Sequence, residues 1–152
     1  MLGLVLFVLG IQQSLIELMN IELILLASVL GAVVLVYLPY LVVAYNRVRL
    51  GYDMSAPRLM FEKFPPYAKR ATWAHQNSFE ALIIYAPAAL MAYVTGVESM
   101  VAGYAAIAFL IVRFLYSLCY ILDFALIRPL MFVLGLTCSG ILFALSLLQV
   151  AG

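Results

Sequence analysis

Charged side chains are scarce in this sequence. Only 10% of its 152 residues are charged, whereas 68% are hydrophobic, and the mean hydropathy is +1.17. Soluble domains are typically about 25% charged and about 45–50% apolar, and a soluble chain of this size leaves too much surface exposed to hide this apolar excess. The composition therefore excludes a soluble protein and predicts an integral membrane protein, organised as a single domain over residues 1–152.

Histidine and cysteine are also rare. His75 is the single histidine, and Cys119 and Cys138 lie inside apolar runs without CxxC spacing. A metal centre needs clustered ligands and is not predicted, and the cysteines are interpreted as small core residues. His75 is expected to contact the membrane interface or a loop. The formal net charge is only +1, and no basic stripe with interleaved aromatic residues predicts nucleic-acid binding.

Long apolar runs dominate the chain instead. About 20 residues cross a bilayer as a helix, and the second run reaches this length only if its helix begins near residue 67 and includes polar side chains. Residues 1–19 contain an apolar stretch too short to span, so we expect an interfacial or extended lead-in there. The pattern predicts an all-α membrane protein, a four-transmembrane-helix bundle, with spans at about 21–45, 67–94, 100–122 and 129–150.

The basic residues gather on one side of this layout. Six of the eight lie in or beside the connection between the first two spans, Arg128 lies in the third connection, and Arg113 lies in the half of its span that leads there. With an even number of crossings, all of them belong to the same side of the membrane. The positive-inside rule predicts that this side is cytoplasmic and that both termini lie opposite.

Polar residues enter the second and third spans at helical spacing, i, i+3, i+7 and onward, which places them on one face of each helix. Charged groups are costly when they face lipid, so these faces should point into the bundle or into a wet cavity. The two faces consist of Arg70, Trp73, Asn77, Glu80 and Ile84, with Gln76 beside them, and of Arg113, Tyr116 and Tyr120.

These polar faces have two interpretations. Glu80 and Arg113 can form a buried ion pair that fixes the helix register, with Asn77 hydrogen-bonding across the interface. Alternatively, the arginines and tyrosines, which outnumber the carboxylates Glu80 and Asp123, line a cavity that attracts an anionic ligand from the cytosol. Spacing alone leaves both open.

The polar motifs resemble those of a known family. An NxxE motif at 77–80 follows a basic helix start, an RxxYxxxY motif occupies 113–120, and Arg128 stands near the next helix start. This arrangement, over residues 47–135, is similar to the MAPEG family, the membrane-associated proteins of eicosanoid and glutathione metabolism, and most similar to its bacterial branch. The resemblance implies a homotrimer in a bacterial inner membrane, with glutathione bound as co-substrate between neighbouring subunits near the cytoplasmic side.

The resemblance also implies roles for individual residues. Asn77 and Glu80 would contact the glutathione backbone, and either Arg47 or Arg49 would bind a glutathione carboxylate. Arg128 would hold the glutathione sulfur as thiolate, because a neighbouring guanidinium lowers the pKa of a thiol from its usual value of about 8.5. The other residues that the resemblance places at the glutathione site are Arg70, Gln76, Arg113, Tyr116 and Tyr120.

Two positions depart from the family pattern. Gln76 stands where several eukaryotic members have arginine, and Pro129 stands where the prostaglandin branch has serine. The resemblance therefore favours a glutathione transferase, with or without peroxidase activity, acting on hydrophobic or lipid electrophiles that enter from the membrane. The alternative is a non-catalytic lipid-binding or partner-regulating protein. A purely structural bundle requires Glu80 and Arg113 to pair with each other.

Overall fold

The computed structural model describes residues 20–152, which form four long helices and one short 3-10 helix and contain no strand. All four long helices are long and apolar enough to cross a membrane, which confirms the predicted all-α, four-span architecture. The lead-in predicted for residues 1–19 lies outside the described residues. The elements are α2 (Ile21–Arg49), η1 (Leu59–Lys63), α3 (Pro66–Val94), α4 (Met100–Ile121) and α5 (Ile127–Ala151).

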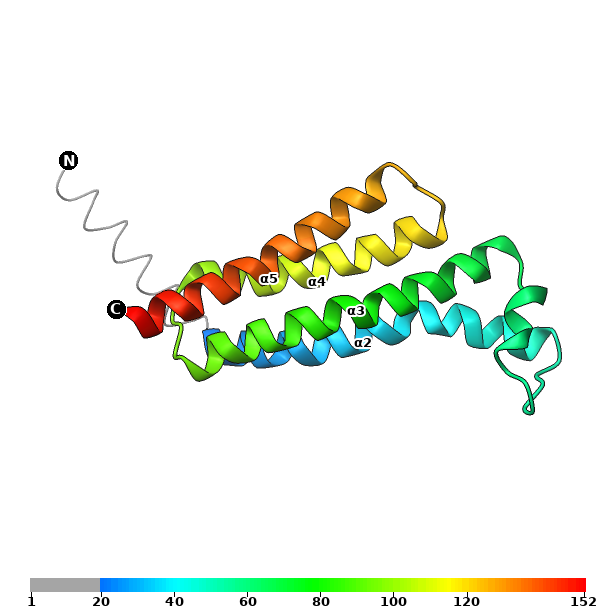
Figure 1. Cartoon of the computed structure of the whole chain (residues 1–152), viewed down its shortest axis with the longest axis horizontal. Coiled ribbons are helices and arrows are strands. Elements are labelled where there is room, and N and C mark those ends of the chain that lie inside the picture. The colour runs from blue at the N-terminus through cyan, green and yellow to red at the C-terminus, as the bar shows by residue number, and fades with distance from the viewer. Residues whose placement is uncertain (1–19) are drawn as a thin grey trace.

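The helices form two antiparallel pairs, α2 with α3 and α4 with α5, that pack against each other along the bundle (Figure 1). The loop between α2 and α3 lies at the same end as the α4–α5 connection, and the C-terminus lies at the opposite end (Figure 1). We call the first of these the basic end, because the arginines and lysines of residues 47–70 and Arg128 lie there. The side of the membrane that this end faces stays a prediction.

Helices α3 and α4 are central, since each packs against the other three long helices. Small side chains on α3 and α4 let the backbones approach closely, as is usual where membrane helices associate without a hydrophobic driving force. These buried residues are Ala68, Ala71, Ala74, Ala88, Ala89 and Ala92 on α3, and Ala102, Ala105 and Ala106 on α4.

Local sequence sets the helix ends. The Asn20 side chain accepts a hydrogen bond from the Leu23 amide at 3.0 Å and caps α2. Proline occupies the first position of α3, where its missing N–H costs nothing. Helix α5 begins at Ile127, so Arg128 lies within the first turn instead of immediately before it. Pro129 is tolerated there because the first four amides of a helix have no intrahelical partner.

Tyr85 ties three helices together in the middle of the bundle. Its hydroxyl donates to Ser28 Oγ on α2 at 2.6 Å, and its ring stacks on that of Phe109 on α4, with the centroids 3.6 Å apart. Ser28 Oγ in turn donates to the Leu25 carbonyl at 2.6 Å. Hydrogen bonding and ring stacking therefore act at a single fully buried side chain.

Tyr85→Phe is expected to lower the free energy of unfolding by about 0.6–1 kcal/mol, because it removes one interhelical hydrogen bond while keeping the ring. Tyr85→Leu also removes the stacking and should cost about 2–4 kcal/mol. Unfolding in detergent, followed by circular dichroism, measures both. No loss in Tyr85→Phe would contradict a contribution from the hydroxyl, and equal losses in the two variants would contradict a separate contribution from the ring stacking.

Candidate functional site

Arg113 on α4 is the most deeply buried charged side chain of the described bundle, with 3% of its surface exposed. Its Nη2 donates to Ser78 Oγ at 3.2 Å and to the backbone and side-chain oxygens of Asn77 at 3.3 and 3.4 Å. Asn77 Nδ2 donates to Glu80 Oε2 at 3.1 Å. The Asn77 amide therefore bridges the guanidinium and the carboxylate.

The direct Glu80–Arg113 ion pair considered from the sequence is wrong. Among residues 20–152, the only carboxylate and guanidinium within 4 Å of each other are those of Asp123 and Arg70. The Glu80 side chain is exposed, and the Nε of Arg113 is buried without a partner. A bundle in which Glu80 and Arg113 neutralise each other and close the cavity is therefore not what the chain forms.

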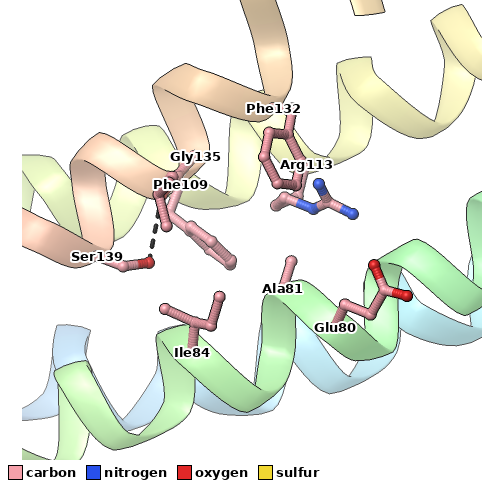
Figure 2. Close-up of a pocket in the computed structure, with 9 residues that line it drawn as sticks. Glu80, Ala81, Ile84, Phe109, Arg113, Phe132, Gly135 and Ser139 are labelled. Carbon is pink, nitrogen blue, oxygen red and sulfur yellow. Dashed lines mark hydrogen bonds between the residues drawn. The ribbon is translucent and has the colours of Figure 1, made fainter. Parts of the chain in front are cut away.

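Arg113 and Glu80 stand at one end of a cavity of about 130 Å³ between α3, α4 and α5, which we call the Arg113 cavity. Figure 2 shows the two charged groups on the same side, with Ile84 and Phe109 at the other. The cavity thus has a charged end and an apolar end. Its lining residues are Glu80, Ala81, Ile84, Phe109, Arg113, Phe132, Gly135, Leu136 and Ser139.

Two tyrosines stand between two arginines in a continuous series of contacts that runs from Arg113 toward the basic end. The Arg113 guanidinium lies 4.3 Å from the centroid of the Tyr116 ring, and the Tyr116 and Tyr120 rings meet edge to face at 5.6 Å. The Arg128 guanidinium lies 4.4 Å from the Tyr120 ring. We call these four residues the Arg–Tyr ladder. Cation–π contact stabilises each guanidinium without using its N–H donors.

The Arg128 end of the ladder opens into a second cavity of about 360 Å³, the basic-end cavity. Here Arg70 is held in place: its Nε donates to the Ile121 carbonyl at 3.0 Å and its Nη1 pairs with Asp123 Oδ2 at 3.2 Å. Arg128 has no carboxylate within 4 Å in the described chain. The basic-end cavity is lined by Phe64, Pro66, Lys69, Arg70, Trp73, Tyr120, Asp123 and Arg128.

Arg47 and Gln76 lie elsewhere within the subunit. They line a third cavity of about 510 Å³ between α2, α3 and the loop, here called the Arg47 cavity, whose wall includes His75. The Arg47 Nη1 donates to the Tyr40 hydroxyl at 3.1 Å. Arg49 is exposed at the end of α2 and lines none of these cavities. The structure therefore brings Arg70, Asn77, Glu80, Arg113, Tyr116, Tyr120 and Arg128 together, and leaves Arg47, Arg49 and Gln76 apart from them.

Trp73 separates two of the cavities. It lines both the Arg47 cavity and the basic-end cavity, as does Phe64 from the end of the α2–α3 loop. Figure 1 shows this loop closing over the ends of α2 and α3 at the basic end. A single aromatic wall thus stands between the two groups of basic side chains.

His75 contacts α2, and it lines the Arg47 cavity together with Pro57 and Arg58 of the loop; its contact with the membrane interface stays a prediction. Its Nδ1 lies 2.7 Å from the Val36 carbonyl, and its ring packs against Tyr37, Tyr40 and Phe79. Since a carbonyl only accepts, Nδ1 bears the proton. Pro39 has no N–H to donate within α2 and disturbs the preceding turn. The carbonyl that Pro39 leaves without its helical donor is that of Leu35, so His75 donates to the neighbouring carbonyl in the disturbed turn.

Comparison with known proteins identifies the chain. The profile of the MAPEG family matches residues 24–148, nearly all of the described chain. This chain belongs to the MAPEG family. Neither the curated proteins nor the solved structures gave a significant match. It is therefore an integral, multi-pass membrane protein of a family that acts in glutathione and eicosanoid metabolism.

Several site residues of this MAPEG protein escaped sequence reasoning. Ser78 is the clearest, since it directly contacts Arg113 but is a small residue one position off the NxxE motif. On α5 the helix is apolar almost all round, so no change in polarity marks the face that lines the Arg113 cavity. The unrecognised lining residues there are Phe132, Gly135, Leu136 and Ser139.

Proposed function

We propose that this MAPEG protein is a glutathione transferase that joins the glutathione thiolate to hydrophobic or lipid electrophiles. The observation that supports this best is the Arg–Tyr ladder, which holds Arg113 and Arg128 against aromatic rings with no carboxylate within 4 Å of either. Two uncompensated guanidiniums in a sheltered site attract an anion. Glutathione, with two carboxylates and an ionisable thiol, has the matching chemistry.

Glutathione also has a cationic amino group, and the proposed site offers it a partner. Glu80 has an exposed carboxylate held by the Asn77 amide, so it can accept from the peptide's amino end while Asn77 contacts the peptide backbone. Arg113 forms one end of the ladder, and Arg70 lies beside Arg128 at the other end. These two arginines can bind the two carboxylates of glutathione. With the amino group and the carboxylates of glutathione bound in this way, its thiol would lie toward Arg128.

Arg128 is the proposed catalytic residue. It lies in the first turn of α5, where the positive end of the helix dipole adds to its own charge. Both effects lower the pKa of a bound thiol from about 8.5 and so increase the thiolate fraction at neutral pH.

With an alkyl or aryl halide, the thiolate forms a carbon–sulfur bond and the halide leaves with the bonding electrons. With a hydroperoxide, the same sulfur takes the terminal oxygen and the alcohol leaves after protonation. The sulfenic acid that is left then condenses with a second glutathione, which yields the disulfide and water.

Binding and turnover of glutathione test this function. Protein purified in detergent should unfold several degrees higher with millimolar glutathione than without it, because ligand binding to the folded state raises stability. It should also conjugate glutathione to benzyl chloride. Absence of both effects would overturn the proposal.

We further propose that the protein is a homotrimer with its basic end in the cytoplasm and glutathione bound between subunits. Arg47 and Gln76 lie in a cavity separated by Trp73 from the ladder of the same chain. They can reach glutathione only from a neighbouring copy. Closed symmetric rings are the usual outcome of such contacts between unlike surfaces.

Mixing two inactive variants tests the shared site. Arg47→Ala and Arg128→Ala subunits, expressed together, should regain about one quarter of wild-type activity in randomly mixed trimers, because some sites then receive both arginines. Each variant alone should stay inactive, and conjugation of benzyl chloride measures all three samples. If the mixture is no more active than its components, either both arginines act within one subunit or the two variants do not assemble into mixed trimers.

A lipid-binding protein without chemistry is the second candidate. It is favoured by an apolar groove of about 610 Å³ between α2 and α4, lined by residues such as Leu30, Val34 and Phe114. This reading predicts lipid that copurifies with the protein and a melting temperature that does not respond to glutathione. The thermal measurement therefore separates the two candidates directly.

A further inference from the structure

The apolar end of the Arg113 cavity has no role in binding glutathione in the scheme above. Beyond Glu80 and Arg113, the wall is formed mainly by hydrocarbon from Ile84, Phe109 and Phe132 (Figure 2). The Ser139 hydroxyl lies at this end but donates to the Gly135 carbonyl at 3.3 Å. The apolar end therefore offers shape and hydrophobic contact with little polar recognition.

The volume of the cavity sets the size of what it can hold. It measures about 130 Å³. An apolar protein cavity of about 150 Å³, lined by similar side chains, stays dry and binds benzene. One aromatic ring, or a branched alkyl group of equal bulk, fits this space, and we expect two fused rings to exceed it.

The cavity opens at the surface of the subunit between α3 and α5. Three of its apolar lining residues are partly exposed on these helices: Ile84 (40%), Phe132 (39%) and Leu136 (47%). We place this opening toward the acyl chains of the membrane. A hydrophobic molecule dissolved in the bilayer can therefore enter laterally and reach Arg113 without crossing water.

Gly135 controls the space beside Arg113. A Cβ atom at this position would lie 3.5 Å from Arg113 Cδ and 3.9 Å from Phe109 Cε2, so a methyl group fits in ordinary contact and a larger side chain must occupy the cavity. Gly140, one turn further along α5, would place a Cβ with nothing within 4 Å. The two glycines form a matched pair for experiment.

We propose that the Arg113 cavity binds the apolar part of the second substrate, that it accepts one ring but not two, and that Gly135 and Ile84 set this limit. The role of the bound molecule as second substrate rests on the proposed transferase function, whereas the binding of an aromatic ring rests only on the cavity. The ring lies in the apolar end with its reactive carbon toward the charged end.

Direct binding tests the site without glutathione. Fluorobenzene, which is inert to thiols, should show saturable exchange broadening in ¹⁹F spectra with wild-type protein and Gly140→Leu in lipid nanodiscs. Gly135→Leu should show none beyond the nanodisc background. Saturable binding that survives in Gly135→Leu, or its absence from wild type, would overturn the proposal.

A variant with an enlarged cavity should bind a larger ligand, and misfolding cannot produce such a gain in binding. Ile84→Ala should bind 1-fluoronaphthalene, which the wild type should not. In turnover, the ratio of kcat/KM for 1-(chloromethyl)naphthalene over benzyl chloride should rise by about tenfold in this variant. If neither binding nor the ratio changes, Ile84 does not set the size limit. If fluorobenzene binds as expected but no conjugate forms with any acceptor, the transferase function fails and the binding site stands.

Discussion

Arg128→Ala is expected to lower kcat/KM for conjugation at pH 7 by about 100-fold or more, because the bound thiol returns toward its ordinary pKa of about 8.5 and loses the charge that holds the thiolate. Arg128 is suited to this role because its guanidinium rests on the Tyr120 ring with no carboxylate within 4 Å in the described chain. Arg128→Lys should restore part of the activity, and Lys63→Ala, an exposed change outside the three cavities, should have little effect.

The pH profile distinguishes thiolate stabilisation from simple binding. In the wild type, the lowered thiol pKa means that the thiolate is already populated near neutral pH, so the rate should level off early as pH rises. In Arg128→Ala, the rate should keep rising through about pH 8.5, so the deficit is largest in acid and smallest in alkali. A uniform deficit at every pH would mean that Arg128 only positions glutathione.

Arg113→Met is expected to keep or raise the thermal stability of the protein while weakening glutathione binding by about 30-fold or more. A buried charge incurs a desolvation cost, and an apolar side chain of similar volume often replaces it without loss of stability. Binding must fall, because a charge-assisted contact to the ligand disappears. Thermal unfolding and titration calorimetry with glutathione measure the two effects separately.

Arg113→Ala is the matched comparison, since it removes both the charge and the packing volume and should lower the melting temperature. The Ser78 hydroxyl keeps its bond to the Ala74 carbonyl in either variant, so no buried hydroxyl is left without a partner. If Arg113→Met loses as much stability as Arg113→Ala and binds glutathione as tightly as the wild type, the arginine is retained for structure and the binding role is wrong.

The fold was predictable because its signal is simple. Four apolar runs, each near the thickness of a bilayer, leave few alternatives to four helices, and the helical period correctly grouped Arg70, Asn77 and Glu80 on the side of α3 that faces the ladder. The period describes one helix at a time, however. It could not show that the Asn77 amide lies between Glu80 and Arg113, and so it suggested an ion pair.

The remaining differences have two physical origins. Within one subunit Gln76 and Arg47 lie apart from the ladder, because their positions depend on how α2, α3 and the loop pack together, which no single-helix pattern describes. Their role at a site shared between subunits stays a prediction. The α5 residues of the Arg113 cavity, such as Gly135, were invisible because an almost wholly apolar helix does not distinguish a cavity wall from a surface that faces lipid.

The wall between the Arg47 cavity and the basic-end cavity has a practical consequence. Trp73 forms this wall, and it is the only tryptophan in the chain. The intrinsic fluorescence of the unmodified protein therefore comes from one indole that borders both groups of basic side chains. Any ligand that enters either space alters the polarity around that indole, so occupancy can be followed optically without labels.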